Sequence, residues 1–173
     1  MDRWGACNRV LAQFNPSRFL EIGVKHGRGS RKIEAHVRLG VDPAPEPASH
    51  AYTRFYQRTS DEFFADQTMR DILNSVSHLH PRGAVVVHDC NPQTEAALRI
   101  PREQVVWNGD CWKAIVRLRA TRPDLHIYTL DVDQGLGIVE WSRGERLITV
   151  PEELTWEGLV VHRGEWLGLC PPS

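Results

Sequence analysis

The sequence lacks the features that mark membrane, secreted and nucleic-acid-binding proteins. No stretch approaches the roughly 18 apolar residues that a membrane-spanning helix needs, and the first residues contain no apolar segment of a secretory signal. The formal net charge is -1, from 21 basic and 22 acidic residues, and lacks the basic excess of a general nucleic-acid or anionic-membrane binder. We therefore expect a cytoplasmic protein that binds neither nucleic acid nor membranes.

Closely spaced cysteines are also lacking. The four cysteines are Cys7, Cys90, Cys111 and Cys170. This spacing contains no CxxC pair, which argues against a disulfide framework or a zinc knuckle and favours reduced thiols. The length of 173 residues fits a single domain over 1–173. Within it we expect an N-terminal helix in 1–16 and a C-terminal packing tail in 142–173.

Hydrophobic periodicity predicts helices that alternate with strands. Apolar residues at three- and four-residue spacing predict helices in the first 14 residues, at 69–79, and from the expected cap Asp110 to just before Pro123. Short apolar runs predict strands at 19–24, 37–41, 54–58, 84–87, 126–130 and 137–141, the last two as a strand pair. This order indicates an α/β fold with a mostly parallel sheet and helices on both faces.

Residues suited to ligand binding follow the first three predicted strands, at the edge where parallel sheets bind ligands. They are Glu21, Gly23 and Gly27 after the first strand, Asp42 after the second, and Ser60 and Asp61 after the third. Glycines let the backbone approach a ligand closely. Asp42 lies 21 residues after Glu21, where a carboxylate can accept hydrogen bonds from ribose hydroxyls. Taken singly, each residue could also belong to a plain turn.

The glycine spacing differs from that of a dinucleotide site. A GxGxxG run places a pyrophosphate on a helix N-terminus, whereas this sequence has Glu-x-Gly-x-x-x-Gly. A carboxylate two residues before the first glycine would repel a pyrophosphate. It suits a cationic group instead, such as the ammonium or the sulfonium of S-adenosylmethionine. A nicotinamide-dependent oxidoreductase on a Rossmann sheet is therefore the weaker alternative.

With these motifs the sequence resembles the class I S-adenosylmethionine-dependent methyltransferases. The motifs are FLEIGV at 19–24 with Gly27, GVDP at 40–43, TSDEFF at 59–64, VHDCNP at 87–92 and WNGDCWKAI at 107–115. The last two are similar to a bacterial subgroup of small-molecule methyltransferases, and the resemblance covers most of 17–141. It implies a Rossmann-like three-layer sandwich, S-adenosylmethionine as cofactor, and a small hydroxylated substrate such as a sugar or a natural-product intermediate.

The resemblance also implies a role for each residue. Around the cofactor it places Glu21, Gly23 and Gly27 at the methionine part, Asp42 at the ribose, and Ser60 and Asp61 near the adenine. His88 and Asp89 would face the transferred methyl group, as a general base and the carboxylate that orients it. Two other interpretations stay open: Asp89 and Asn91 as oxygen ligands of Mg²⁺, or a strand-end turn in which they cap backbone groups. We assign no metal site.

One central helix–strand unit of the family is missing. Only six residues, 65–70, separate the TSDEFF motif from the body of the next predicted helix, too few for a buried strand and its connections. We expect strand 84–87 to move beside strand 19–24, because residues 61–83 suffice for a right-handed crossover. Alternatively, a second copy of the chain supplies the missing surface in a homodimer. The shortened chain also suggests a degenerate relative that binds the cofactor without catalysis.

Overall fold

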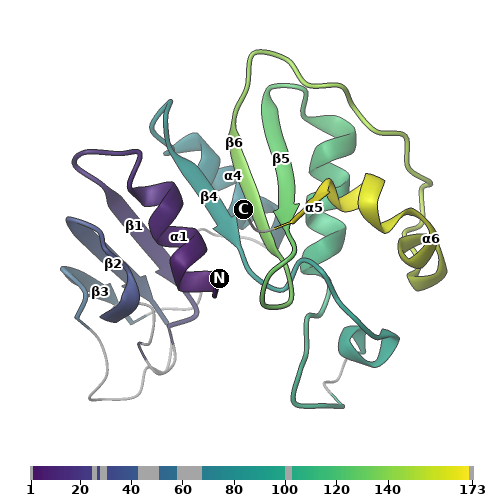
Figure 1. The fold of residues 1–173 in the computed structure, drawn as a ribbon, viewed down its shortest axis with the longest axis horizontal. Helices are drawn as coiled ribbons and strands as arrows, with labels where there is room; N and C mark the ends of the chain where they lie inside the picture. The colour runs from purple at the N-terminus through teal and green to yellow at the C-terminus, as the bar shows by residue number, and fades with distance from the viewer. Residues whose placement is uncertain are drawn as a thin grey trace. The chain divides into compact units, whose positions relative to one another are not determined.

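The computed structural model describes residues 2–24, 27, 31–42, 51–57, 68–99 and 103–171. The chain divides into two compact units, Asp2–Ser77 and His78–Ser173, called here the N-terminal and the C-terminal unit (Figure 1). Within the described segments, no helix has the length and apolar character needed to cross a bilayer.

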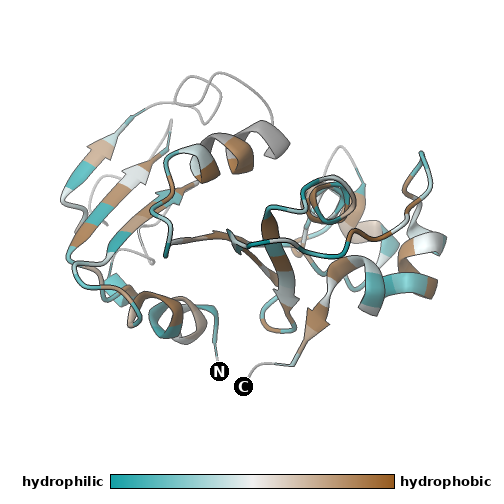
Figure 2. Ribbon diagram, turned by 90° about the horizontal axis from the view of Figure 1, so that it is seen from above, coloured by the Kyte–Doolittle hydropathy of each residue, from teal (hydrophilic) through white to brown (hydrophobic). Residues whose placement is uncertain are grey.

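The N-terminal unit contains a three-stranded parallel sheet in the order β1-β2-β3. Its elements are α1 (Arg3–Leu11), β1 (Arg18–Ile22), β2 (Val37–Val41), β3 (Arg54–Tyr56) and α4 (Thr68–Ser77). The Asp2 carboxylate caps α1 by accepting a hydrogen bond from the Gly5 N–H, 2.9 Å. Hydrophobic and hydrophilic residues are interleaved along the helices (Figure 2), as expected for elements with one buried face. The predicted parallel strand order of this half is confirmed.

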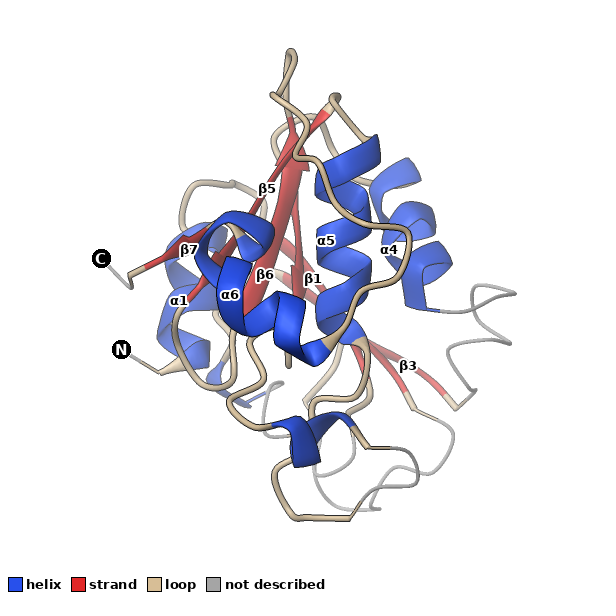
Figure 3. Cartoon of the chain, turned by 90° about the vertical axis from the view of Figure 1, so that its right-hand side faces the viewer, coloured by secondary structure: helices blue, strands red, loops and turns tan. Residues whose placement is uncertain are grey.

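The C-terminal unit contains a mixed four-stranded sheet in the order β4-β6-β5-β7. Its elements are β4 (Ala84–Val87), the 3₁₀ helix η1 (Glu95–Leu98), α5 (Cys111–Thr121), β5 (Leu125–Leu130), β6 (Leu136–Trp141), α6 (Trp156–Leu167) and β7 (Leu169–Cys170). Strand β6 runs antiparallel to both neighbours, and β7 runs parallel to β5 (Figure 3). The predicted strand pair at 126–130 and 137–141 is confirmed as β5 and β6.

Helices α5 and α6 form the main hydrophobic core of the C-terminal unit. The Trp112 and Trp166 rings stack nearly parallel, with their centroids 6.5 Å apart. The same core includes the buried residues Val116, Leu154, Leu159 and Leu167. Residues 142–173, predicted as a packing tail, do supply part of this core. They also form α6 and β7, two elements that the periodicity did not predict.

Two details of the predicted secondary structure differ from the observed one. Asp110 does precede α5, but its carboxylate makes no hydrogen bond to the helix N–H groups and pairs with Lys113 Nζ at 3.0 Å. The predicted pairing of strand 84–87 with strand 19–24 is not among the described ladders, in which β1 pairs with β2 and β4 with β6. The fold is therefore α/β with one parallel and one mixed sheet.

Candidate functional site

Glu21, Gly23 and Asp42 come together at the carboxyl ends of β1 and β2. The register pairs Glu21 with Gly40, and the Gly23 N–H extends the ladder by donating to the Val41 carbonyl at 2.9 Å. Paired residues on neighbouring strands share one face of the sheet. Glu21 therefore shares a face with Gly40, and Gly23 and Asp42 directly follow the adjoining ends of β1 and β2.

The two glycines of this motif adopt a backbone conformation that side chains disfavour. Gly23 has φ +80° and Gly27 has φ +62°, both in the left-handed region. A Cβ added at Gly23 would meet no atom within 4 Å among the described residues. The turn therefore leaves open space beside the Gly23 backbone, where a ligand can approach closely.

Tyr52 holds the Glu21 carboxylate, a contact that the sequence motifs did not reveal. The Tyr52 hydroxyl donates a hydrogen bond to Glu21 Oε2. Gly40 makes this reach possible, because a Cβ there would come within 3.0 Å of the Tyr52 ring and 2.8 Å of the Phe55 ring. Burial raises the pKa of the Glu21 carboxyl, while the Tyr52 hydrogen bond and the charge of Arg3 act in the opposite direction.

Asp42 lies at the end of β2 with only 8% of its surface exposed. Its backbone N–H donates to the Tyr56 carbonyl at 3.2 Å, which fixes the strand end beside β3. The Asp42 backbone is thus fixed at the carboxyl end of β2, and its role as a ribose acceptor stays a prediction. Ser60 and Asp61, predicted near the adenine, lie outside the described residues.

In the C-terminal unit, His88 follows β4 and lies between two aspartates. His88 Nδ1 is 3.2 Å from Asp89 Oδ1. His88 Nε2 is 2.7 Å from the backbone carbonyl oxygen of Asp133 and 3.6 Å from its Oδ2. A carbonyl oxygen only accepts hydrogen bonds, so Nε2 carries a proton.

This geometry limits what His88 can do as it stands. A general base needs a ring nitrogen that faces the proton it removes, and here Nε2 faces Asp133 while Nδ1 faces Asp89. His88 can act as a base only after Nε2 has left the Asp133 carbonyl and its proton has moved to Nδ1, beside Asp89. Asp89 itself has φ +65°, and its Oδ1 also accepts a weak hydrogen bond from Asn108 Nδ2 at 3.5 Å. The catalytic roles of His88 and Asp89 stay predictions.

Asn91, considered above as a metal ligand, is fully engaged by the protein. It is buried, its Nδ2 donates to Asp131 Oδ1 at 2.9 Å, and its Oδ1 accepts from the Arg163 guanidinium. A guanidinium on this oxygen competes with any metal cation. Among the described residues, no three His, Cys, Asp or Glu side chains are grouped so that they could hold a metal ion.

The loop between β5 and β6 is bound to the end of β4. Asn91 N–H donates to the Gln134 carbonyl at 2.7 Å, and Cys90 N–H donates to the Gly135 carbonyl at 3.1 Å. Asp133, Gln134 and Gly135 have successive φ values of +44°, +66° and +85°. This left-handed loop brings Asp133 to His88, a contact that sequence motifs missed. The available signal was the Asp-Gln-Gly turn between two predicted strands.

The cysteines near this loop are free, unreactive thiols. Burial raises the pKa of the Cys90 thiol well above its usual value, and it raises that of Cys111 to about 11. Since the thiolate is the reactive form, neither group is a nucleophile at neutral pH. Cys7 and Cys170 are also free.

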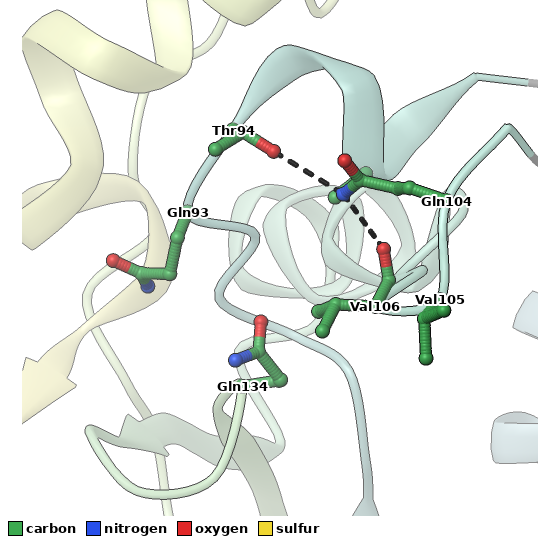
Figure 4. Close-up of a pocket in the computed structure, with 7 residues that line it drawn as sticks. Gln93, Thr94, Gln104, Val105, Val106 and Gln134 are labelled. Carbon is green, nitrogen blue, oxygen red and sulfur yellow. Dashed lines mark hydrogen bonds between the residues drawn. The ribbon is translucent and has the colours of Figure 1, made fainter.

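A pocket of about 470 Å³ opens beside the same loop (Figure 4). Gln134 lines it and follows Asp133 directly, while Asn108 Nδ2 donates at 3.5 Å both to Asp89 Oδ1 and to the Gln134 carbonyl. The pocket therefore shares a hydrogen-bond network with His88 and Asp89.

Comparison with known protein families and with curated proteins finds no match for this chain. The resemblance to methyltransferases accordingly depends on the sequence motifs alone.

Proposed function

We propose that the chain binds S-adenosylmethionine at the carboxyl ends of β1 and β2 and transfers its methyl group to a small hydroxylated molecule. The observation that carries this proposal is the placement of Glu21, Gly23 and Asp42 at the adjoining carboxyl ends of β1 and β2. An acid, an open glycine turn and a second acid in this order suit a ligand with an ammonium group at one end and a ribose at the other.

The residues present fit this cofactor. The Glu21 carboxylate would bind the ammonium, the open space at Gly23 would admit the methionine part, and Asp42 would accept hydrogen bonds from the ribose hydroxyls. When bound, S-adenosylmethionine would supply an electrophilic methyl group for in-line displacement. His88 Nε2 would accept the proton of the attacking hydroxyl once it has left the Asp133 carbonyl and the ring proton has moved to Nδ1, where Asp89 would accept its hydrogen bond.

Calorimetric titration with S-adenosylhomocysteine tests the cofactor site. Asp42→Asn keeps the shape and removes the charge that receives the ribose hydroxyls. Hydrogen bonds to a charged group contribute about 1.5–3 kcal/mol, so we expect affinity to fall by about 10- to 100-fold. The matched control is Glu34→Gln, which neutralises an exposed carboxylate of the same unit and should leave affinity unchanged. Equal affinity of Asp42→Asn and the original chain would refute the ribose assignment.

A second candidate function is cofactor binding without catalysis. The observation in its favour is the closed position of His88, whose Nε2 donates to a backbone carbonyl at 2.7 Å. Methyl transfer from radiolabelled S-adenosylmethionine to a panel of hydroxylated acceptors separates the two candidates. Labelled product supports the methyltransferase, whereas tight S-adenosylhomocysteine binding with no labelled product supports cofactor binding without catalysis.

A further inference from the structure

Gly40 leaves a gap on the face of the three-stranded sheet that carries Glu21. The register pairs Gly40 with Glu21 on β1 and with Phe55 on β3, so all three positions share one face and Gly40 lies in the middle. A Cβ at Gly40 would come within 2.8 Å of the Phe55 ring and 3.0 Å of the Tyr52 ring. The two rings therefore occupy the gap, and Tyr52 reaches Glu21 across the width of β2.

Tyr52 is held in this position through its backbone and through its ring. The next residue, Thr53, donates its backbone N–H to the Arg38 carbonyl at 2.7 Å, and its Oγ1 accepts from the Arg38 N–H at 3.1 Å. The Tyr52 and Phe55 rings pack against each other with their centroids 5.9 Å apart. These contacts fix the side chain so that its hydroxyl is directed at Glu21 Oε2.

The Glu21 carboxyl is half-buried between groups of α1 and of the segment before β3. Tyr52 donates to it, and Arg3 and Cys7 of α1 lie close enough to interact with its charge. Burial raises the pKa of Glu21, whereas the Tyr52 hydrogen bond and Arg3 lower it. The Cys7 thiol is neutral near pH 7, because burial raises its pKa to about 11. Among the described residues, Tyr52 and Arg3 are therefore the groups that favour the ionised carboxylate.

The ionised form is the one that can bind a cation. A carboxylate accepts charge-assisted hydrogen bonds from an ammonium group, and a neutral carboxyl forms no such ion pair. A hydrogen bond donated to the carboxylate stabilises the ionised form over the neutral form. The Tyr52 contact also fixes one carboxylate oxygen and with it the orientation of the group.

We propose that Tyr52 is a positioning residue of the cofactor site, which holds the Glu21 carboxylate in place for the ammonium group of S-adenosylmethionine. This inference rests on the proposed function, because it needs the cofactor to bind beside Glu21. Tyr52 contacts the carboxylate and not the ligand. Its effect on affinity is therefore confined to ligands with an ammonium group and depends on pH.

Calorimetric titrations of the full chain with two ligands test this inference between about pH 5.5 and pH 8. S-adenosylhomocysteine carries the ammonium group, and 5′-methylthioadenosine has the same adenosine part without it. We expect S-adenosylhomocysteine affinity to fall as pH decreases and Glu21 becomes protonated. In Tyr52→Phe this loss should begin at higher pH, with affinity about tenfold lower at the acidic end. The affinity of 5′-methylthioadenosine should be the same in both chains at every pH.

The variant and its control differ only in which hydroxyl is removed. Tyr52→Phe keeps the ring over Gly40, and circular dichroism shows whether it is folded. Tyr128→Phe makes the same change on β5 of the C-terminal unit and should leave both affinities and their pH dependence unchanged. A third readout needs no ligand: the ¹³C signal of the Glu21 carboxyl in the free chain should titrate at higher pH in Tyr52→Phe than in the original chain.

The outcomes separate this inference from the proposed function. One pH profile for S-adenosylhomocysteine in Tyr52→Phe and the original chain would overturn the inference, as would an unchanged titration of the Glu21 carboxyl. An equal loss of both ligands in Tyr52→Phe would also overturn it, because it would indicate a purely structural role. In each of these cases the proposed function stands, provided that the original chain binds S-adenosylhomocysteine. If the original chain binds neither ligand, the proposed function fails and the inference fails with it.

Discussion

Glu21 is a residue whose surroundings favour the protonated carboxyl. Burial raises its pKa in the folded protein above the value in the unfolded chain. The stability that this group contributes is therefore present below the unfolded pKa and is lost as pH rises through the folded pKa. We expect Glu21→Gln to raise the unfolding midpoint of the chain at pH 7 and to leave it nearly unchanged at pH 4, as measured by circular dichroism.

The control for this prediction is Glu34→Gln, because Glu34 is an exposed carboxylate of the same unit. It should show no comparable gain between pH 4 and pH 7. A Glu21→Gln variant that is less stable than the original chain at pH 7 would contradict the prediction. The expected gain in stability is consistent with a binding site, because side chains placed to bind a ligand often destabilise the free protein.

Gly23 and Gly135 share a left-handed backbone but differ in the space around them. Their φ values are +80° and +85°. A Cβ at Gly23 meets nothing within 4 Å, whereas a Cβ at Gly135 would lie 2.4 Å from the Asn91 backbone nitrogen. We expect Gly23→Ala to cost about 1–2 kcal/mol of unfolding free energy through strain alone. Gly135→Ala should cost about 3 kcal/mol or more, because overpacking adds to strain.

Urea denaturation of both variants measures this difference. Similar losses for the two would show that the contact between the 133–135 loop and Asn91 is not as tight as described. Gly23→Ala has a second use, because its methyl group would project into the proposed cofactor site. In that variant the loss of binding free energy for S-adenosylhomocysteine should exceed the loss of unfolding free energy.

Residues of the candidate site differ in how far the sequence could predict them. Glu21, Gly23 and Asp42 were predictable, because each directly follows or ends an apolar run and parallel strands end at one edge. The contact of Tyr52 with Glu21 was not predictable, because it depends on the absence of a side chain at Gly40 in the neighbouring strand. The contact of Asp133 with His88 was not predictable either, because the two residues are 45 positions apart and are brought together by a left-handed loop.

At the scale of elements, α6 shows why periodicity can miss a helix. Leu159, Trp166 and Leu167 are buried while Val160 and Val161 on the same helix are exposed, so apolar residues occur on several faces. The end signals were nevertheless present: the Thr155 hydroxyl accepts from the Gly158 N–H at 3.2 Å, and Gly168 ends the helix at φ +57°. Capping residues were the better guide for this segment.

Helix α6 also supports the turn after β4, through one arginine. Arg163 Nη1 donates to Asn91 Oδ1 and to the Pro92 carbonyl, the latter at 2.6 Å. Hydrogen bonds from a charged donor contribute about 1.5–3 kcal/mol, so Arg163→Ala should lower the unfolding free energy by that amount. Arg143→Ala, at an exposed position, should change it by less than about 0.5 kcal/mol.

Hydrogen exchange gives this prediction a local readout. In Arg163→Ala the amides of Cys90 and Asn91, which donate to the β5–β6 loop, should exchange faster than in Arg143→Ala. Unchanged exchange at both amides would mean that the loop, and not α6, holds the end of β4.

At the scale of the whole molecule, local order was more predictable than the pairing of distant strands. The strands at β1, β2, β5 and β6 were predicted because each has its own apolar pattern and its sequence neighbour as a pairing partner. The partner of β4 was harder to predict, because no short turn connects the two strands in the sequence. The observed partner β6 lies about 50 residues further along the chain.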